Sequence, residues 1–213
     1  MAAGRQKVAR VTRRILVRGP RIVLRAPHAQ DREDFLAATR ASRAFHRPWV
    51  APPTTPAAFQ AYLQRNAQDD FEALLACERE SGHFIGAFNL SQIFRGGFQN
   101  AYLGYWAIHG FQGRGLMSEA LQLVLAYTFR TLKLHRVEAN IQPGNAASRA
   151  LASRAGFRME GFSPRYLKVG GRWRDHERWA LCREDWRPTN SQTPGPDQTP
   201  AQDSRARGSG RQV

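Results

Sequence analysis

The chain has 213 residues, a formal net charge of +15 and 42% hydrophobic residues, and this apolar fraction excludes a wholly disordered chain. Its two cysteines, Cys77 and Cys182, are too few for a disulfide scaffold or a multi-cysteine zinc site, and no uncharged apolar run approaches the roughly 20 residues needed to cross a bilayer. The basic N-terminus is not followed by the apolar segment of a signal peptide, so we expect a soluble cytoplasmic protein without membrane contact.

Composition divides the chain into three parts. Residues 1–19 carry six Arg or Lys residues and no acid, which predicts a flexible basic arm. The arm is either simply solvated or makes weak contact with an anionic partner such as RNA or the ribosome. Residues 187–213 are rich in Pro, Gly, Gln and Ser, and predict a disordered tail. One domain is expected over 20–186, as a monomer or a homodimer.

Hydrophobic patterns within this domain alternate between strand and helix periods. Asp31 is the expected N-cap of the first helix and Gly156 the expected C-cap of the last. The expected elements are a strand over 21–26, helices over 30–45 and 57–66, strands over 72–78, 83–91 and 100–108, a helix over 115–132, a strand over 136–141, a helix over 146–155, and strands over 157–162, 166–169 and 176–182. This order predicts a mixed α/β sheet.

A glycine-rich turn joins the strand over 100–108 to the helix over 115–132. It reads Gln112-Gly113-Arg114-Gly115-Leu116-Met117-Ser118. Its backbone N–H groups would point outward at the positive end of the helix dipole, and its glycines would let a phosphate approach, with a bidentate contact from Arg114. The alternative is an ordinary loop that needs glycines for geometry alone. A P-loop is excluded because its Gly-Lys-Ser/Thr sequence is absent, and a dinucleotide fingerprint fits poorly because Ser118 stands at its third glycine.

The same turn resembles the Q-x-x-G-x-[GA] signature of the Gcn-related N-acetyltransferase (GNAT) superfamily, with Met117 in the usual Gly or Ala position. Downstream, 145–148 (Asn-Ala-Ala-Ser) and 156–157 (Gly-Phe) resemble the second block of that family. The run from 101 to 186 closely resembles the ribosomal-protein-alanine N-acetyltransferases of the RimJ/RimL type. The resemblance covers about 20–186 and implies a mixed, mostly antiparallel sheet with helices on both faces and splayed central strands.

The resemblance also implies acetyl-CoA as cosubstrate and no metal. The pantetheine arm would pair with the strand backbone and reach Asn145, while the pyrophosphate would take the amides of the turn. The implied binding residues are Tyr105, Trp106, Ala107, Gln112, Gly113, Arg114, Gly115, Leu116, Met117, Ser118 and Asn145. Many relatives have a Tyr seven residues after this Asn, where this chain has Ala152. The RimJ/RimL type instead has a Ser three residues after it, which is Ser148 here.

Two catalytic roles follow from the resemblance. Ser148 is the implied group that stabilises the leaving thiolate by hydrogen bonding, and its alternative role is to cap the helix. Glu72 matches the position of a carboxylate proposed as the base in part of the RimL group. Its alternative is an exposed strand-end glutamate beside two aspartates. Three aromatic residues either line the acceptor cleft or belong to the core, namely Phe45, Trp49 and Tyr166.

The implied activity is acetyl-CoA-dependent N-acetylation of the N-terminal α-amine of a protein, with a ribosomal protein that begins with Ala or Ser as a candidate. Holding an α-amine neutral at pH 7 costs about 1.4 kcal/mol or less, against roughly 4–5 kcal/mol for a lysine amine, so a modest base suffices. Two alternatives stay open. One is an acetyltransferase for a small-molecule amine such as an aminoglycoside, a polyamine or an amino acid. The other is a non-catalytic module that binds acyl-CoA or nucleic acid.

Overall fold

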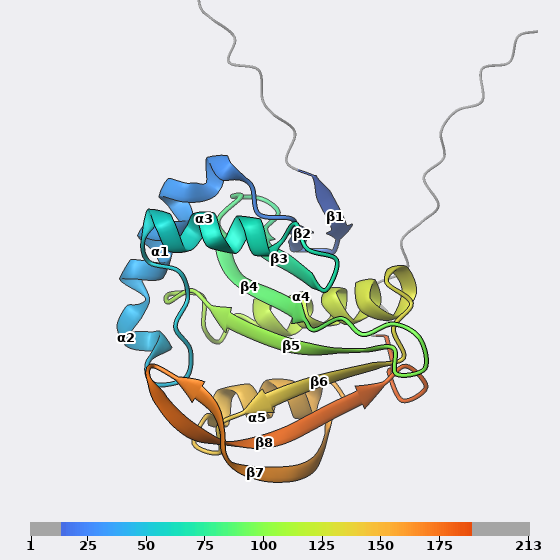
Figure 1. The fold of residues 1–213 in the computed structure, drawn as a ribbon. Helices are drawn as coiled ribbons and strands as arrows, with labels where there is room; N and C mark the ends of the chain where they lie inside the picture. The colour runs from blue at the N-terminus through green and yellow to red at the C-terminus, as the bar shows by residue number, and fades with distance from the viewer. Residues whose placement is uncertain (1–13, 189–213) are drawn as a thin grey trace, which may run out of the picture.

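The computed structural model describes residues 14–188 and contains an eight-stranded sheet with helices on both faces (Figure 1). The strands lie in the order β1-β2-β3-β4-β5-β6-β8-β7, and all neighbours are antiparallel except β5 and β6. This confirms the mixed, mostly antiparallel sheet. The strands are β1 (Ile15–Arg18), β2 (Ile22–Arg25), β3 (Phe71–Glu78), β4 (Phe84–Ser91), β5 (Asn100–Ala107), β6 (Arg136–Ile141), β7 (Arg158–Val169) and β8 (Arg172–Cys182).

The helices form two layers. On one face, α1 and α3 bury Phe35 and Phe59, and on the other α4 and α5 bury Leu121 and Leu151 (Figure 1). None of the helices within 14–188 is long and apolar enough to span a membrane. The helices are α1 (Arg32–Ala41), α2 (Arg43–His46), α3 (Pro56–Arg65), α4 (Leu116–Ala126) and α5 (Ala146–Arg154), with a 3-10 turn η1 (Ala29–Asp31) before α1 and a π-helical turn η2 (Tyr127–Thr131) after α4.

The parallel strands β5 and β6 are paired at one end only. Their register runs from Asn100 to Tyr102 on β5, but β5 continues to Ala107 and β6 continues to Ile141. Beyond Tyr102, β5 is paired with β4 on its other edge alone. The central strands therefore splay apart, as expected, and each turns an unpaired backbone edge toward the gap between them.

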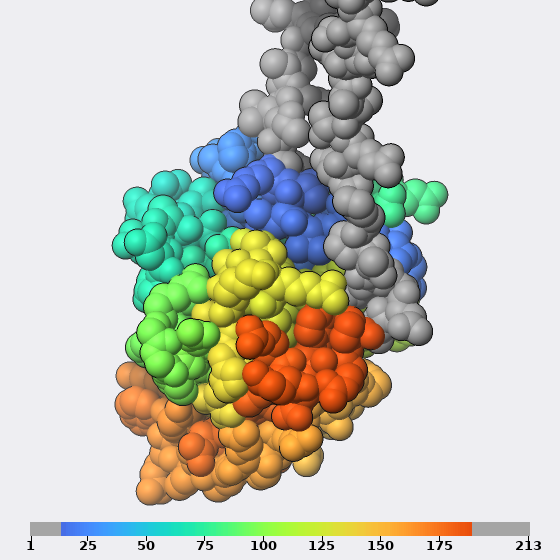
Figure 2. Space-filling model, turned by 90° about the vertical axis from the view of Figure 1, so that its right-hand side faces the viewer, coloured from blue at the N-terminus to red at the C-terminus, as the bar shows by residue number. Residues whose placement is uncertain are grey.

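The end of the sheet at which β5 and β6 are paired is closely packed. There η2, the start of β6 and the end of β8 gather (Figure 2). The rings of Phe129 and Trp186 lie 5.5 Å apart, and the Arg130 guanidinium lies 5.0 Å from the centre of the same indole. Since β5 and β6 are paired at this end, the gap between them opens toward their C-terminal ends.

The boundary of the basic arm needs correction. Residues 15–18 form β1, which pairs with β2, so the sheet extends into the segment 1–19 that the sequence assigns to the arm. The remainder of the arm, 1–13, lies outside the described residues, as does the tail over 189–213.

Two further expectations differ from the structure. The helix expected over 30–45 is divided into η1, α1 and α2, and Asp31 makes no capping hydrogen bond to α1. Its carboxylate instead accepts hydrogen bonds from the buried guanidinium of Arg25 at 2.6 Å and from the His28 N–H at 2.8 Å. The last hairpin contains one continuous strand, β7, where the sequence predicts two, because β7 stays paired with β8 on both sides of two register shifts.

Candidate active site

A cavity of about 580 Å³ lies where β5 and β6 splay apart. Its walls come from the C-terminal halves of both strands, the glycine turn, the first turns of α4 and α5, and the region of α2. Most of the site residues expected from the sequence line it, namely Tyr105, Trp106, Ala107, Gln112, Gly113, Gly115, Leu116, Met117, Ser118, Asn145 and Ser148. Glu72 and Arg114 do not.

The glycine turn leads into an uncapped helix N-terminus. Gly113 and Gly115 have φ values of +74° and +73°, a left-handed backbone that favours glycine. Gly115 is the N-cap of α4 and no side chain caps this helix, so the N–H groups of its first turn lack intrahelical partners. Free amides at the positive end of a helix dipole form an anion site. The glycine geometry of this turn is therefore compatible with anion binding.

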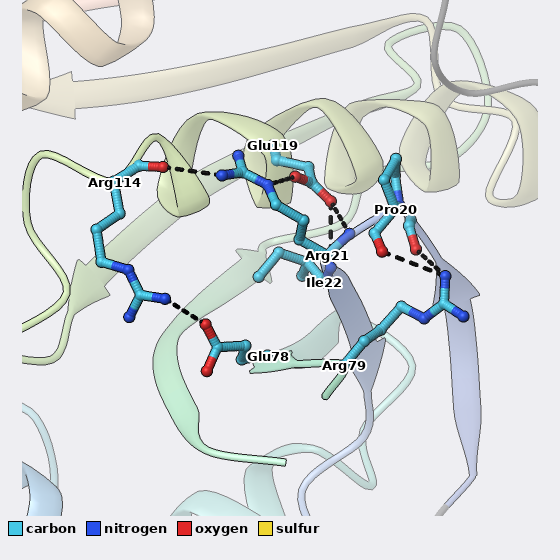
Figure 3. A network of polar contacts seen from close by, with 8 residues as sticks. Pro20, Arg21, Ile22, Glu78, Arg79, Arg114 and Glu119 are labelled. Atoms are coloured by element: carbon cyan, nitrogen blue, oxygen red, sulfur yellow. Dashed lines mark hydrogen bonds and ion pairs between the residues drawn. The ribbon is translucent and has the colours of Figure 1, made fainter. Parts of the chain in front are cut away.

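A polar network behind the turn fixes its position (Figure 3). The Glu119 carboxylate on α4 accepts hydrogen bonds from the backbone N–H of Arg21 at 2.7 Å and from Arg21 Nε at 2.8 Å. It also accepts one from the Ile22 N–H at 3.1 Å. The Arg21 guanidinium in turn donates to the Arg114 carbonyl at 3.1 Å. The start of β2 therefore holds the last peptides of the turn and the first turn of α4 together.

The Arg114 side chain lies outside the cavity. Its Nη2 atom is 2.5 Å from Glu78 Oε1 (Figure 3). Its guanidinium lies 5.5 Å from the centre of the Phe111 ring. Because a carboxylate already occupies this guanidinium, the geometry does not support the expected bidentate contact with an anion. The contribution of Arg114 to the turn is its backbone.

The first turn of α5 contains Asn145 and Ser148. Asn145 Oδ1 accepts the Ser148 backbone N–H at 3.1 Å, so the helix is capped by Asn145 rather than by Ser148. The Tyr105 hydroxyl donates to the Ser148 carbonyl at 3.1 Å. Burial raises the pKa of Tyr105 to about 12, so this phenol remains a donor at neutral pH. The Tyr105 hydrogen bond ties α5 to β5.

Glu72 is separated from this site. It lies on β3 opposite Leu90 of β4, on the far side of β4 from β5. Its carboxylate accepts a hydrogen bond from the Tyr127 hydroxyl at 3.2 Å, and burial raises its pKa. The structure does not bring Glu72 to the cavity, and so does not support its assignment as the base.

Of the three aromatic residues whose roles the sequence leaves open, two line the cavity and one does not. Phe45 and Trp49 line the cavity, and the Trp49 carbonyl accepts a hydrogen bond from Gln142 Nε2 at 3.2 Å. Tyr166 does not line it, and its ring centre lies 6.2 Å from that of His176. The segment after α2 therefore forms one wall of the cavity.

Two histidines that the sequence does not mark as site residues also line the cavity, namely His46 and His176. His46 Nε2 lies 2.8 Å from the Ala107 carbonyl, and His176 Nδ1 lies 3.0 Å from the Arg174 carbonyl. Burial lowers the pKa of both rings. The two residues stand 130 positions apart on α2 and β8, so no local motif marks them.

Among residues 14–188, those that line the cavity include no Asp or Glu. Arg154 and the two histidines supply its basic side chains. Between residues 14 and 188 there is also no group of three or more His, Cys, Asp or Glu side chains that could hold a metal ion.

Residues 21–158 match the family model described as the acetyltransferase (GNAT) domain. The chain belongs to this family. This GNAT chain is 35% identical over 176 residues to the [Ribosomal protein uS5]-alanine N-acetyltransferase of Escherichia coli, an alignment that covers 79% of the chain and 91% of that relative. It is 36% identical over 127 residues to the probable N-acetyltransferase YjcK of Bacillus subtilis, covering 60% and 68%. The solved structure of Mycobacterium smegmatis RimJ in complex with CoA-disulfide aligns with a TM-score of 0.71 at 27% identity, covering 76% and 82%.

The GNAT chain is therefore an acetyl-CoA-dependent N-acetyltransferase, and its cavity fits that cosubstrate. The uncapped amides of α4 suit a pyrophosphate, and the unpaired edge of β5 suits the amides of a pantetheine arm. A Cβ atom at Gly104, halfway along that edge, would meet nothing within 4 Å, so the cavity continues over this residue. When bound, acetyl-CoA supplies the activated acetyl group.

Proposed function

We propose that this enzyme acetylates the N-terminal α-amine of a protein, with a ribosomal protein that begins with Ala or Ser as the acceptor. The described residues that line the cavity include no carboxylate, and this observation favours an α-amine over a small polycationic acceptor. An aminoglycoside or polyamine holds several positive charges at neutral pH, and burying such charges without partners is strongly unfavourable. The similarity to a uS5-alanine N-acetyltransferase along 91% of its length supports the same choice.

An acceptor amine with a low pKa, such as an α-amine, suits a cavity whose described lining residues include no carboxylate. Such an amine has a pKa near 7.7–8, and loses its proton at neutral pH for about 1.4 kcal/mol or less. A lysine side chain would need roughly 4–5 kcal/mol for the same step. A site that lacks carboxylates can therefore accept a neutral α-amine far more readily than a lysine ammonium.

Each part of the site then has a role. The amides of Gly115 to Ser118 hold the pyrophosphate, and the edges of β5 and β6 orient the extended arm that follows it. Asn145 fixes the first turn of α5, which leaves the Ser148 hydroxyl available to stabilise the sulfur that leaves. Phe45 and Trp49 lie on the wall formed by α2 and the segment after it, where the acceptor residue would enter.

Peptide acetylation measured by mass tests this assignment. The enzyme is incubated with acetyl-CoA and short peptides that begin with Ala or Ser, with the same peptides blocked at the N-terminus but containing Lys, and with an aminoglycoside or a polyamine. We expect an added mass of about 42 Da on the free N-termini alone, since the α-amine is the cheaper amine to deprotonate. The proposal would be contradicted if the small amines were acetylated and the peptides were not.

A further inference from the structure

His176 lies at the open end of the gap between β5 and β6. It stands on β8, and its neighbour Glu177 pairs with Ile141, the last residue of β6. The residue as a whole is 3% exposed, yet His176 lines the cavity. A basic nitrogen is thus held at the place where β6 ends and the cavity wall continues into Gln142.

The hydrogen bond of the ring determines which nitrogen is free. Nδ1 lies 3.0 Å from the Arg174 carbonyl, and a carbonyl only accepts, so Nδ1 is the donor and carries the hydrogen. In the neutral ring, Nε2 then holds the lone pair. Within the described chain Nε2 has no hydrogen-bond partner. It is also not completely buried, so it retains access to the cavity that His176 lines.

Burial, and not the charges around it, keeps the His176 ring neutral. Tyr166 faces it from β7, Asp175 precedes it on β8, and Arg154 and His46 are the other basic groups of the cavity. Burial lowers the pKa of His176 and outweighs the Arg174 carbonyl and the Asp175 charge, which raise it. At neutral pH the ring is therefore a proton acceptor.

His46 does not share this arrangement. Its Nε2 is used by the Ala107 carbonyl at 2.8 Å, so its lone pair lies on Nδ1. Nδ1 is fully enclosed and unpaired among the described residues, so an acceptor amine cannot reach it. Glu72 lies outside the cavity, and no carboxylate from the described part of the chain lines it, so His176 is the described group best placed to accept a proton.

We propose that His176 is the general base of the acetyl transfer, an assignment that rests on the proposed function. Its Nε2 accepts one proton from the α-ammonium of the acceptor, which frees the nitrogen lone pair. The nitrogen forms its bond to the acetyl carbon as the carbon–sulfur bond breaks, and the bonding pair stays on sulfur. A second proton of the amine neutralises that sulfur, beside the Ser148 hydroxyl, and the proton on Nε2 returns to solvent.

The variant His176→Asn tests this role, because the asparagine amide can keep a donor toward the Arg174 carbonyl while Nε2 is lost. We expect turnover of an Ala-initiated peptide to fall by about 10²- to 10⁴-fold, with little change in the KM for acetyl-CoA. The thermal shift caused by acetyl-CoA should persist. The control is His135→Asn, a half-exposed histidine paired with Glu184 and absent from the cavity lining, which should keep full turnover.

The pH profile of the unmodified enzyme gives an independent measurement. Because Nε2 must be unprotonated, kcat/KM should fall as pH drops through a pKa below about 6.5, the ordinary value for histidine. In His176→Asn the fall due to His176, the acid limb of the profile, should vanish. The remaining pH dependence of kcat/KM should then reflect only the titration of the peptide α-amine near pH 8.

The outcomes separate the two proposals. Turnover of His176→Asn within threefold of the unmodified enzyme, with the same acid limb, would overturn the role of His176. If the variant does not fold, an unmodified enzyme without the acid limb would overturn it equally. If the unmodified enzyme acetylates no peptide, the proposed acceptor is wrong, and the same comparison is made with the amine that the enzyme does accept.

Discussion

Asn145 Oδ1 accepts the backbone N–H of Ser148 at 3.1 Å, and this contact separates the structural role of one residue from the chemical role of the other. In this chain the sequence Asn145-Ala146-Ala147-Ser148 thus forms a capped helix start. The Ser148 amide is used there, and its hydroxyl has no hydrogen-bond partner within 14–188. The two substitutions at this turn should consequently have different effects.

Ser148→Ala should lower kcat while leaving the free energy of unfolding nearly unchanged, because the hydroxyl does not cap α5. Asn145→Ala should instead reduce stability by about 1 kcal/mol, the usual effect of losing an N-cap. Urea unfolding and steady-state kinetics on both variants check this contrast. Equal turnover in Ser148→Ala would remove the serine from the mechanism.

Gly115→Glu should abolish the stabilisation of the fold by acetyl-CoA. The new carboxylate would stand at the N-terminus of α4, where the free amides would otherwise bind the anion. The matched control is Gly115→Asn, since asparagine tolerates the φ of +73° better than other residues and adds no charge. Melting temperature is measured against acetyl-CoA concentration, and the shift should grow with concentration in the unmodified chain and the control. A full shift in Gly115→Glu would place the anion elsewhere.

Glu72→Gln should leave peptide turnover unchanged, because Glu72 lies outside the cavity and the amide oxygen can still accept from Tyr127. Burial raises the pKa of Glu72, so the folded state binds the proton more tightly than the unfolded state. Stability should therefore fall as pH rises from about 4.5 through the raised pKa, and this fall should be smaller in Glu72→Gln. Urea unfolding from pH 4 to 7 measures it. A large loss of turnover would restore Glu72 as the base.

Two truncations should separate the basic arm from the sheet. Deleting 1–13 removes four basic residues and leaves β1, so peptide acetylation should persist. If the arm contacts RNA or the ribosome, the log–log salt slope of binding should flatten by about 0.7–0.9 for each lost phosphate contact. Deleting 1–19 also removes β1 and exposes the edge of β2, which should lower stability. An unchanged salt slope would mean that the arm makes no such contact.

The sequence predicted those parts of the protein that local patterns encode. The alternation of Val137, Ala139 and Ile141 identifies β6, and the glycines before α4 identify the turn that leads into its uncapped N-terminus. β1 was missed because its four residues gain their order from pairing with β2, a contact that no local pattern records.

Long-range contacts explain the remaining differences at the site. Arg114 has the right charge and position for an anion, but Glu78, from a distant hairpin, binds its guanidinium. His46 on α2 and His176 on β8 line the same cavity only because of the tertiary fold, so spacing in the chain could not predict them.

The divergence of β5 and β6 has a consequence for aggregation. Exposed strand edges are templates on which other chains assemble, and proteins usually blunt them with charge, proline or a covering loop. This enzyme keeps two such edges but turns them toward each other inside a concave space of about 580 Å³, walled by bulky side chains such as Trp49 and Phe111. A neighbouring polypeptide strand with its side chains would meet these walls, whereas a thin extended molecule can enter. The recess should thus leave unpaired backbone accessible to a thin ligand while hindering its pairing with a strand of another protein.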